Sequence, residues 1–159
     1  MKKTFNKTVS ILFFATIITF LGSCEDKNEY FDWKAMNDDW LKEHRQDKGF
    51  TISKTGLCYK VIRKGNPADR NPNPTSYIKA TYTGKLIDGT IFTEGEEVNM
   101  GRLNQTIKGM QEALLMMHTG DIYELYIPYN LGYGKTGSIG KIPPYSTLYF
   151  KIELIDSGL

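Results

Sequence analysis

The feature that most restricts the fold is a series of strand-like runs in which apolar and polar residues alternate. Such runs lie at residues 57–63, 121–127 and 147–155, and a longer β-rich run extends over residues 77–87. Asp88-Gly89 follows the longer run and is typical of a tight turn between antiparallel strands. Successive side chains of a strand point to opposite faces, so each run can bury one face. We therefore expect an antiparallel sheet of about five strands.

A single short helix is predicted among these strands, over residues 108–117. Its apolar side chains recur at the spacing of one helix face. Several antiparallel strands beside one amphipathic helix favour an α+β fold, with the helix against the concave face of the sheet. The residues of the buried helix face would be Met110, Ala113, Leu114 and Met117.

The first 23 residues predict a secretory signal peptide. Three lysines precede an apolar run over residues 9–21, which is thirteen residues long, whereas a membrane-spanning helix needs about 20. Residues 21–24, LGSC, resemble a bacterial lipobox, in which the Cys becomes the lipidated first residue of the mature protein. We therefore expect an exported lipoprotein, anchored through acyl chains on Cys24 to a membrane, with the outer membrane preferred. An ordinary N-terminal transmembrane anchor is the alternative.

Residues 24–54 are expected to link this anchor to a folded domain over residues 55–159. Within the linker, residues 28–48 predict an amphipathic helix that Gly49 would end. The helix could pack on the domain, connect it to the membrane, or form a dimerisation or partner-docking surface, so the oligomeric state stays open. Its apolar residues are Phe31, Met36, Trp40 and Leu41.

Charge and rare residues exclude several classes of function. Three of the 20 basic residues and none of the 18 acidic ones lie in the first 23 positions, so the remainder has a net charge near −1. This balance of charges does not indicate nucleic-acid binding. His44 and His118 stand alone, so neither a metal nor a cofactor is predicted. With Cys24 lipidated, Cys58 has no disulfide partner, and we interpret it as a small buried side chain rather than a reactive thiol.

Four segments between residues 55 and 156 resemble, in order and spacing, the motifs of FKBP-type peptidyl-prolyl cis-trans isomerases. Residues 82–92, YTGKLIDGTIF, are similar to the signature YTGxLxDGxxF, and residues 107–114, IKGMQEAL, to the start of the family's helix. Residues 126–134, YIPYNLGYG, resemble the IPxxLxYG turn. Residues 142–154, IPPYSTLYFKIEL, resemble IPPxxxLxFxxEL. Four ordered matches are far more specific than any one short motif.

The resemblance implies the FKBP fold, a curved antiparallel β-sheet wrapped around one short helix. It also implies isomerisation of Xaa-Pro bonds in proline-containing polypeptides, here to assist the folding of exported or envelope proteins. Seven residues would form the site by this resemblance: Tyr82, Phe92, Ile142 and Phe150 as walls of a proline pocket, Met110 as its floor, Ile107 through its backbone N–H, and Tyr133 through its hydroxyl.

The sequence departs from the family pattern at three places beside this site. Thr93 stands where the family usually has Asp, and Met110 where it usually has Trp, which gives a softer floor. Residues 93–100 form a short acidic stretch where many members have a longer flap. These departures leave two functions open: an isomerase, or a catalytically weak FKBP-like module that binds peptides or acts as a chaperone.

Overall fold

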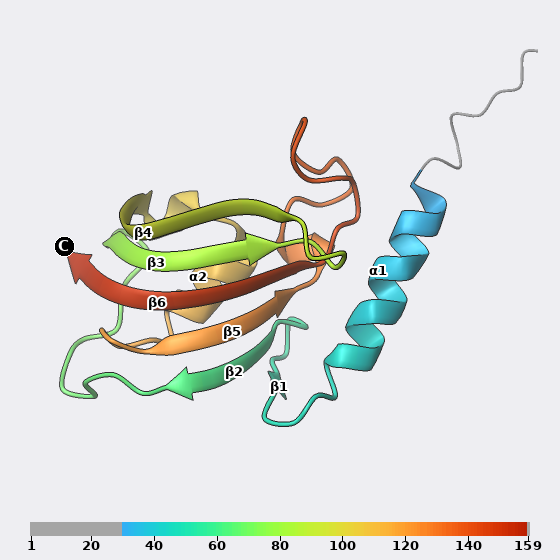
Figure 1. The fold of residues 1–159 in the computed structure, drawn as a ribbon. Helices are drawn as coiled ribbons and strands as arrows, with labels where there is room; N and C mark the ends of the chain where they lie inside the picture. The colour runs from blue at the N-terminus through green and yellow to red at the C-terminus, as the bar shows by residue number, and fades with distance from the viewer. Residues whose placement is uncertain (1–29, 159) are drawn as a thin grey trace, which may run out of the picture.

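The computed structural model describes residues 30–158, which form one curved antiparallel sheet and two α-helices (Figure 1). The six strands lie side by side in the order β1-β2-β5-β6-β3-β4. The predicted α+β architecture is therefore confirmed. In chain order the strands are β1 (Thr51–Ile52), β2 (Cys58–Arg63), β3 (Tyr77–Lys85), β4 (Ile91–Arg102), β5 (Ile122–Ile127) and β6 (Leu148–Gly158).

The four predicted strand runs are present as β2, β3, β5 and β6. The turn at Asp88-Gly89 joins β3 to β4, and Gly89 has a φ of 87°, a conformation that glycine adopts without a steric penalty. Leu86 N donates to Thr90 O at 2.9 Å and closes the turn. Cys58 is 1% exposed in β2, so its interpretation as a buried side chain is confirmed.

The acidic stretch at residues 93–100 lies in β4, the strand that follows the predicted turn at Asp88-Gly89, and sequence analysis did not predict the extent of this strand. This strand runs antiparallel to β3 for its whole length, from Arg102 opposite Tyr77 to Ile91 opposite Lys85. The pairing shifts register at three points, which breaks the alternation of buried and exposed residues. The described residues form six strands where about five were expected, because the two-residue strand β1 was not predicted.

Helix α2 (Lys108–Leu114) lies behind the sheet in Figure 1, and its buried side chains join the sheet in one core. A Cβ on Gly109 would lie 2.5 Å from Ile127 Cγ2, so glycine lets the helix approach β5 closely. The helix ends three residues before the predicted end at Met117, because the chain turns there through the bond from Met117 N to Leu114 O, 3.1 Å long. Met117 is nevertheless fully buried, as predicted.

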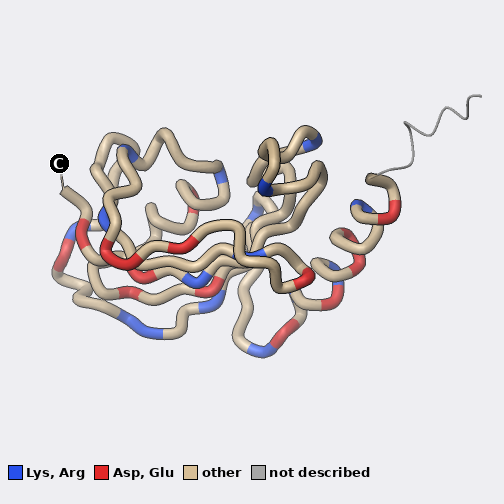
Figure 2. Tube along the Cα trace, turned by 45° about the horizontal axis from the view of Figure 1, so that its top comes forward, with Lys and Arg blue, Asp and Glu red and all other residues tan. Residues whose placement is uncertain are grey.

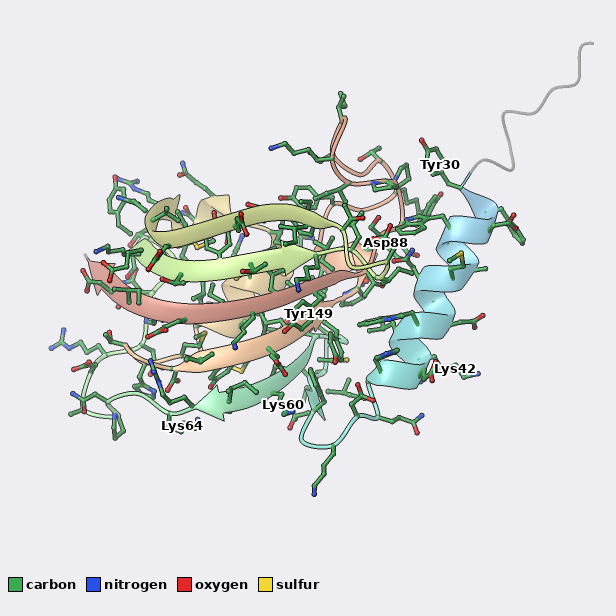
Figure 3. All side chains as sticks on the ribbon, in the orientation of Figure 1. Tyr30, Lys42, Lys60, Lys64, Asp88 and Tyr149 are labelled. Carbon is green, nitrogen blue, oxygen red and sulfur yellow. The ribbon has the colours of Figure 1, made fainter. Side chains whose placement is uncertain are left out.

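Helix α1 (Phe31–His44) lies across one end of the sheet, where the turn that holds Asp88 also lies (Figures 1 and 3). Two of the four predicted apolar residues, Trp40 and Leu41, are partly covered. The other two are exposed, Phe31 to 66% and Met36 to 56%. The residues that the domain covers follow helical spacing but are mixed in polarity: Trp33, Asn37, Trp40, Leu41 and His44.

Aromatic rings join α1 to the sheet. The Trp40 ring meets Tyr126 of β5 edge to face, with centroids 4.9 Å apart. Phe50, which follows the helix, stacks on the Tyr126 ring with the two centroids 4.2 Å apart. Thr51–Ile52 then pairs with β2, so the predicted linker contributes both a docked helix and a strand to the folded unit.

The predicted signal peptide, Cys24 and the first residues of the linker lie outside the described residues, and the domain boundaries stay predictions. Over residues 30–158, no helix has both the length and the apolarity needed to cross a bilayer. Acidic and basic residues are both distributed over the described chain (Figure 2).

Candidate functional site

A pocket of about 240 Å³ opens where β3, β4 and β6 meet the start of α2. This volume is below the roughly 300–1,000 Å³ of pockets that hold drug-sized ligands. It is of a size for one side chain of a polypeptide. No charged residue lines it: the lining residues are Tyr82, Thr93, Met100, Gln105, Thr106, Ile107, Met110, Tyr133 and Phe150.

The structure brings five of the seven predicted residues together on this pocket. They are Tyr82, Ile107, Met110, Tyr133 and Phe150. The apolar base is buried, since Met110 is 2% exposed and Phe150 is 4% exposed. Both belong to the hydrophobic core of the domain.

Phe92 supports the pocket from behind without lining it. Its ring meets Phe150 edge to face, with centroids 5.5 Å apart and planes at 87°. Gly84 in β3 makes this arrangement possible. A Cβ there would lie 2.7 Å from Phe150 Cε1 and 2.8 Å from both Phe92 Cζ and Thr93 Cγ2. The glycine of the YTG motif is therefore a packing requirement of the site.

The backbone N–H of Ile107 is a free donor at the mouth of the pocket. Ile107 precedes the first turn of α2 with extended backbone angles, φ −65° and ψ 151°. Its carbonyl accepts from Met110 N and Gln111 N, both at 3.0 Å, which fixes the residue to the helix. Its own N–H donates to no other group within residues 30–158. A polypeptide carbonyl beside the pocket could accept this hydrogen bond.

The Tyr133 hydroxyl provides a second donor from the loop between β5 and β6. Tyr133 is 38% exposed, and neither its hydroxyl nor that of Tyr82 forms a hydrogen bond within residues 30–158. Partial burial, with Tyr82 close by, raises the pKa of Tyr133 above the ordinary value of 10. The hydroxyl therefore keeps its proton, and remains a donor, throughout the neutral pH range.

Ile142 does not line this pocket. It is 5% exposed and lies instead on a neighbouring, more open hollow of about 510 Å³. Pro143, Pro144 and Leu86 line the same hollow, as does Tyr30 at the start of α1, which Figure 3 labels. The Ile-Pro-Pro segment thus lines this hollow and not the smaller pocket.

Sequence analysis missed three residues of the pocket. Met100 lies near the end of β4, and Gln105 and Thr106 precede α2. None belongs to a motif that carries the family resemblance. Met100 could have been found only by predicting β4 as a strand, because that strand carries it to the pocket. For Gln105 and Thr106 we find no sequence signal.

With this geometry in hand, the sequence was compared with known proteins. The sequence profile of the family described as FKBP-type peptidyl-prolyl cis-trans isomerase matches residues 68–155. The chain belongs to this family. Among solved structures, FkpA from Escherichia coli superposes on this FKBP domain with a TM-score of 0.72 and 35% identity, covering 80% of this chain and 62% of that chain. A peptidyl-prolyl cis-trans isomerase from Pseudomonas syringae gives a TM-score of 0.74 at 26% identity, covering 82% of this chain and 96% of the other.

Curated FKBP relatives are longer than this chain. The FKBP-type 22 kDa peptidyl-prolyl cis-trans isomerase of Escherichia coli K12 is 40% identical over 121 residues, which are 74% of this chain and 57% of that protein. The outer membrane protein MIP of Legionella longbeachae is 37% identical over 125 residues, 77% of this chain and 53% of that one. The chain therefore spans about half the length of the curated relatives it matches.

Proposed function

We propose that this FKBP domain is a peptidyl-prolyl cis-trans isomerase that acts on Xaa-Pro bonds of polypeptides. The observation that carries the proposal is an uncharged pocket, closed at its base by Met110 and Phe150, with two free donors at its rim. Those donors are the Ile107 N–H and the Tyr133 hydroxyl. Proline has a compact apolar ring that suits the pocket, and it has no N–H that would need an acceptor there. The carbonyls of the same polypeptide can accept from the two donors.

The chemistry required of such a site is modest. Rotation about an amide meets a barrier of about 18–20 kcal/mol because resonance keeps the amide planar. Water hydrogen-bonded to the carbonyl favours that planar form. A proline ring held in the apolar pocket removes this water, and each ~1.4 kcal/mol taken off the barrier accelerates rotation about tenfold. Ile107 and Tyr133 would donate to substrate carbonyls outside the rotating amide, and so hold the peptide with its proline ring in the pocket while the amide twists.

The test is a protease-free isomerisation assay with a short Xaa-Pro peptide on the wild type and three variants. Phe150→Ala removes the base of the pocket, and Tyr133→Phe removes one donor while keeping the ring. We expect kcat/KM to fall about tenfold in Tyr133→Phe, the loss of ~1.4 kcal/mol of stabilisation. Tyr77→Phe is the matched control, because Tyr77 is on β3 but outside the pocket, 44% exposed. A folded wild type that leaves the uncatalysed rate unchanged would refute the proposal.

A second function is favoured by two pocket residues that depart from the family pattern. Thr93 lines the wall in place of the usual Asp, and Met110, in place of Trp, forms the floor. A flexible thioether side chain defines a pocket less rigidly than an indole ring. This supports a module that binds proline-containing segments with little turnover. Thr93→Asp combined with Met110→Trp decides between the two: a rise of kcat by orders of magnitude favours the binding module, and an unchanged kcat favours the isomerase.

We further propose that the protein is an exported lipoprotein, held to the outer membrane through Cys24. The LGSC motif supports this, and one relative is named an outer membrane protein. Only residues 25–30 separate Cys24 from α1, a reach of at most ~20 Å when fully extended. The pocket would then work close to the membrane surface, on its periplasmic or external face. Metabolic labelling with radioactive palmitate tests this: label must appear on the wild type and be lost in Cys24→Ser.

A further inference from the structure

Helix α1 is joined by buried hydrogen bonds to the segment that leads from Pro143 into β6. The Trp33 indole Nε1–H donates to Ser146 Oγ at 3.0 Å, and the Ser146 hydroxyl donates in turn to the Pro143 carbonyl at 2.7 Å. One residue further on, Thr147 N donates to Asn37 Oδ1 at 2.7 Å. Buried bonds of this kind hold their partners firmly, since breaking one leaves a polar group without water.

Three of the residues in these bonds are almost entirely removed from solvent, whereas Trp33 and Pro143 are partly exposed. Asn37 is 0% exposed, Ser146 is 2% exposed and Thr147 is 1% exposed. Asn37 also donates from Nδ2 to Trp33 O at 2.8 Å, which ties the two helix residues together. A buried asparagine on a helix with few other buried residues indicates a specific docking contact.

The segment held in this way contains a strained residue. Tyr145 has a φ of 63°, in the left-handed region that costs a non-glycine residue roughly 1–2 kcal/mol. It lies between Pro144 and Ser146, so the bonds from α1 hold the backbone directly after it. Lys34 of α1 also lies 5.9 Å from the centre of the Tyr145 ring. A strained conformation persists where many contacts around it hold it in place, and α1 provides contacts of this kind.

This strained turn is bonded to the part of the loop that carries Tyr133. Tyr145 N donates to Gly134 O at 3.0 Å, one residue after Tyr133. Gly134 N in turn donates to Tyr129 O at 2.8 Å, which closes the loop at its other end. The turn at Tyr145 is therefore bonded to the backbone directly after Tyr133, which lines the pocket.

We propose that α1 is a positioning element of the proline pocket: through Ser146 it holds the strained turn at Tyr145, and through that turn it places the Tyr133 hydroxyl. The predicted effect on kcat rests on the proposed isomerase function, whereas the predicted effect on the loop does not. The proposal predicts that loss of the Ser146 hydroxyl loosens the loop and lowers kcat, because Tyr133 then holds the bound peptide less well in the geometry in which its amide twists. KM changes less, since the base of the pocket is untouched.

The first arm of the test measures the loop directly, by hydrogen exchange of the Tyr145 amide in the full chain. Ser146→Ala and Trp33→Phe should each speed this exchange about tenfold or more. Trp40→Phe is the matched control on α1, since its ring contacts Tyr126 rather than the loop. Exchange at Tyr145 that stays at the wild-type rate in Ser146→Ala, or that rises equally in Trp40→Phe, overturns the proposal. This arm is decisive even if the wild type proves inactive, which would refute only the isomerase function.

The second arm is a double-mutant cycle on kcat. Ser146→Ala should lower kcat about two- to tenfold, the effect of one lost hydrogen bond. If Ser146 acts through Tyr133, then Tyr133→Phe costs at least threefold less in the Ser146→Ala background than in the wild type. If the losses of kcat in the two single variants simply multiply in the double variant, Ser146 serves stability alone, and the proposal is overturned.

Discussion

The tightest packing in the site surrounds Gly84, and the variant Gly84→Ala tests it. The added Cβ would lie within 2.8 Å of atoms of three side chains, Phe92, Thr93 and Phe150, where no real Cβ contact is so short. Overpacking of this kind costs about 1–3 kcal/mol. The backbone of Gly84 has no positive φ, so alanine gains ~0.5–1 kcal/mol in a strand through lower chain entropy. The free energy of unfolding should therefore fall by roughly 0–2.5 kcal/mol, and by about 1–3 kcal/mol relative to a glycine-to-alanine change at an open strand position.

The measurement is urea unfolding together with the peptide isomerisation assay. Because the ring of Phe150 must move away from the new methyl group, kcat/KM should fall about tenfold at a temperature where the variant is folded. Gly158→Ala is the matched control: it lies in β6, has no positive φ, and its Cβ would meet nothing within 4 Å. A Gly84→Ala protein as stable and as active as Gly158→Ala would refute the account of how the pocket is packed.

Two further predictions concern stability. Asn37→Ala leaves the buried Thr147 N–H without an acceptor, so the free energy of unfolding should fall by about 1–3 kcal/mol. Asp38→Ala, on the exposed side of α1, should change it by less than ~0.5 kcal/mol. Equal effects of the two variants in urea unfolding would argue against the docking of α1. Burial raises the pKa of Tyr149 to about 12, and that of Tyr126 still further, above the value near 10 of unfolded tyrosine. The stability that the two protonated tyrosines contribute is complete below pH 10 and is lost as the pH rises towards 12. The urea midpoint should therefore fall over that interval, and fall less steeply with pH in Tyr149→Phe. The same dependence of the midpoint on pH in both proteins would contradict the prediction.

Much of the fold could be predicted because its strands carry regular patterns. β5 and β6 are central strands with one face in the core, so their sequences alternate and their positions are readable. The extent of β4 could not be predicted, for a physical reason. It is an edge strand whose pairing with β3 slips register three times, so no long run of alternating residues remains.

The docking face of α1 could not be predicted from apolar spacing. A search for apolar residues favours Phe31 and Met36, which are exposed, and overlooks Asn37, which is buried. Asn37 can be buried only because Thr147, 110 positions away, donates to it. Such a partner is a property of the tertiary structure and leaves no mark on the local sequence pattern.

The site itself was largely predictable through the family motifs, but its division into two cavities was not. Five motif residues meet on one pocket, whereas Phe92 stands behind Phe150 and Ile142 lines the neighbouring hollow. A motif records which residues occur together. Which side of a loop or ring each one faces depends on close approaches such as that at Gly84.

The measurement that tests the central claim most directly is two-dimensional NMR exchange spectroscopy of an Xaa-Pro peptide with a small amount of the full chain. The uncatalysed isomers interconvert over tens to hundreds of seconds, too slowly to give exchange peaks. We predict that the wild type produces cis-trans exchange peaks, that Tyr133→Phe weakens them about tenfold, and that Tyr77→Phe leaves them unchanged. A folded wild type that produces no exchange peaks, or peaks that survive intact in both Tyr133→Phe and Phe150→Ala, would contradict the claim that this pocket catalyses proline isomerisation.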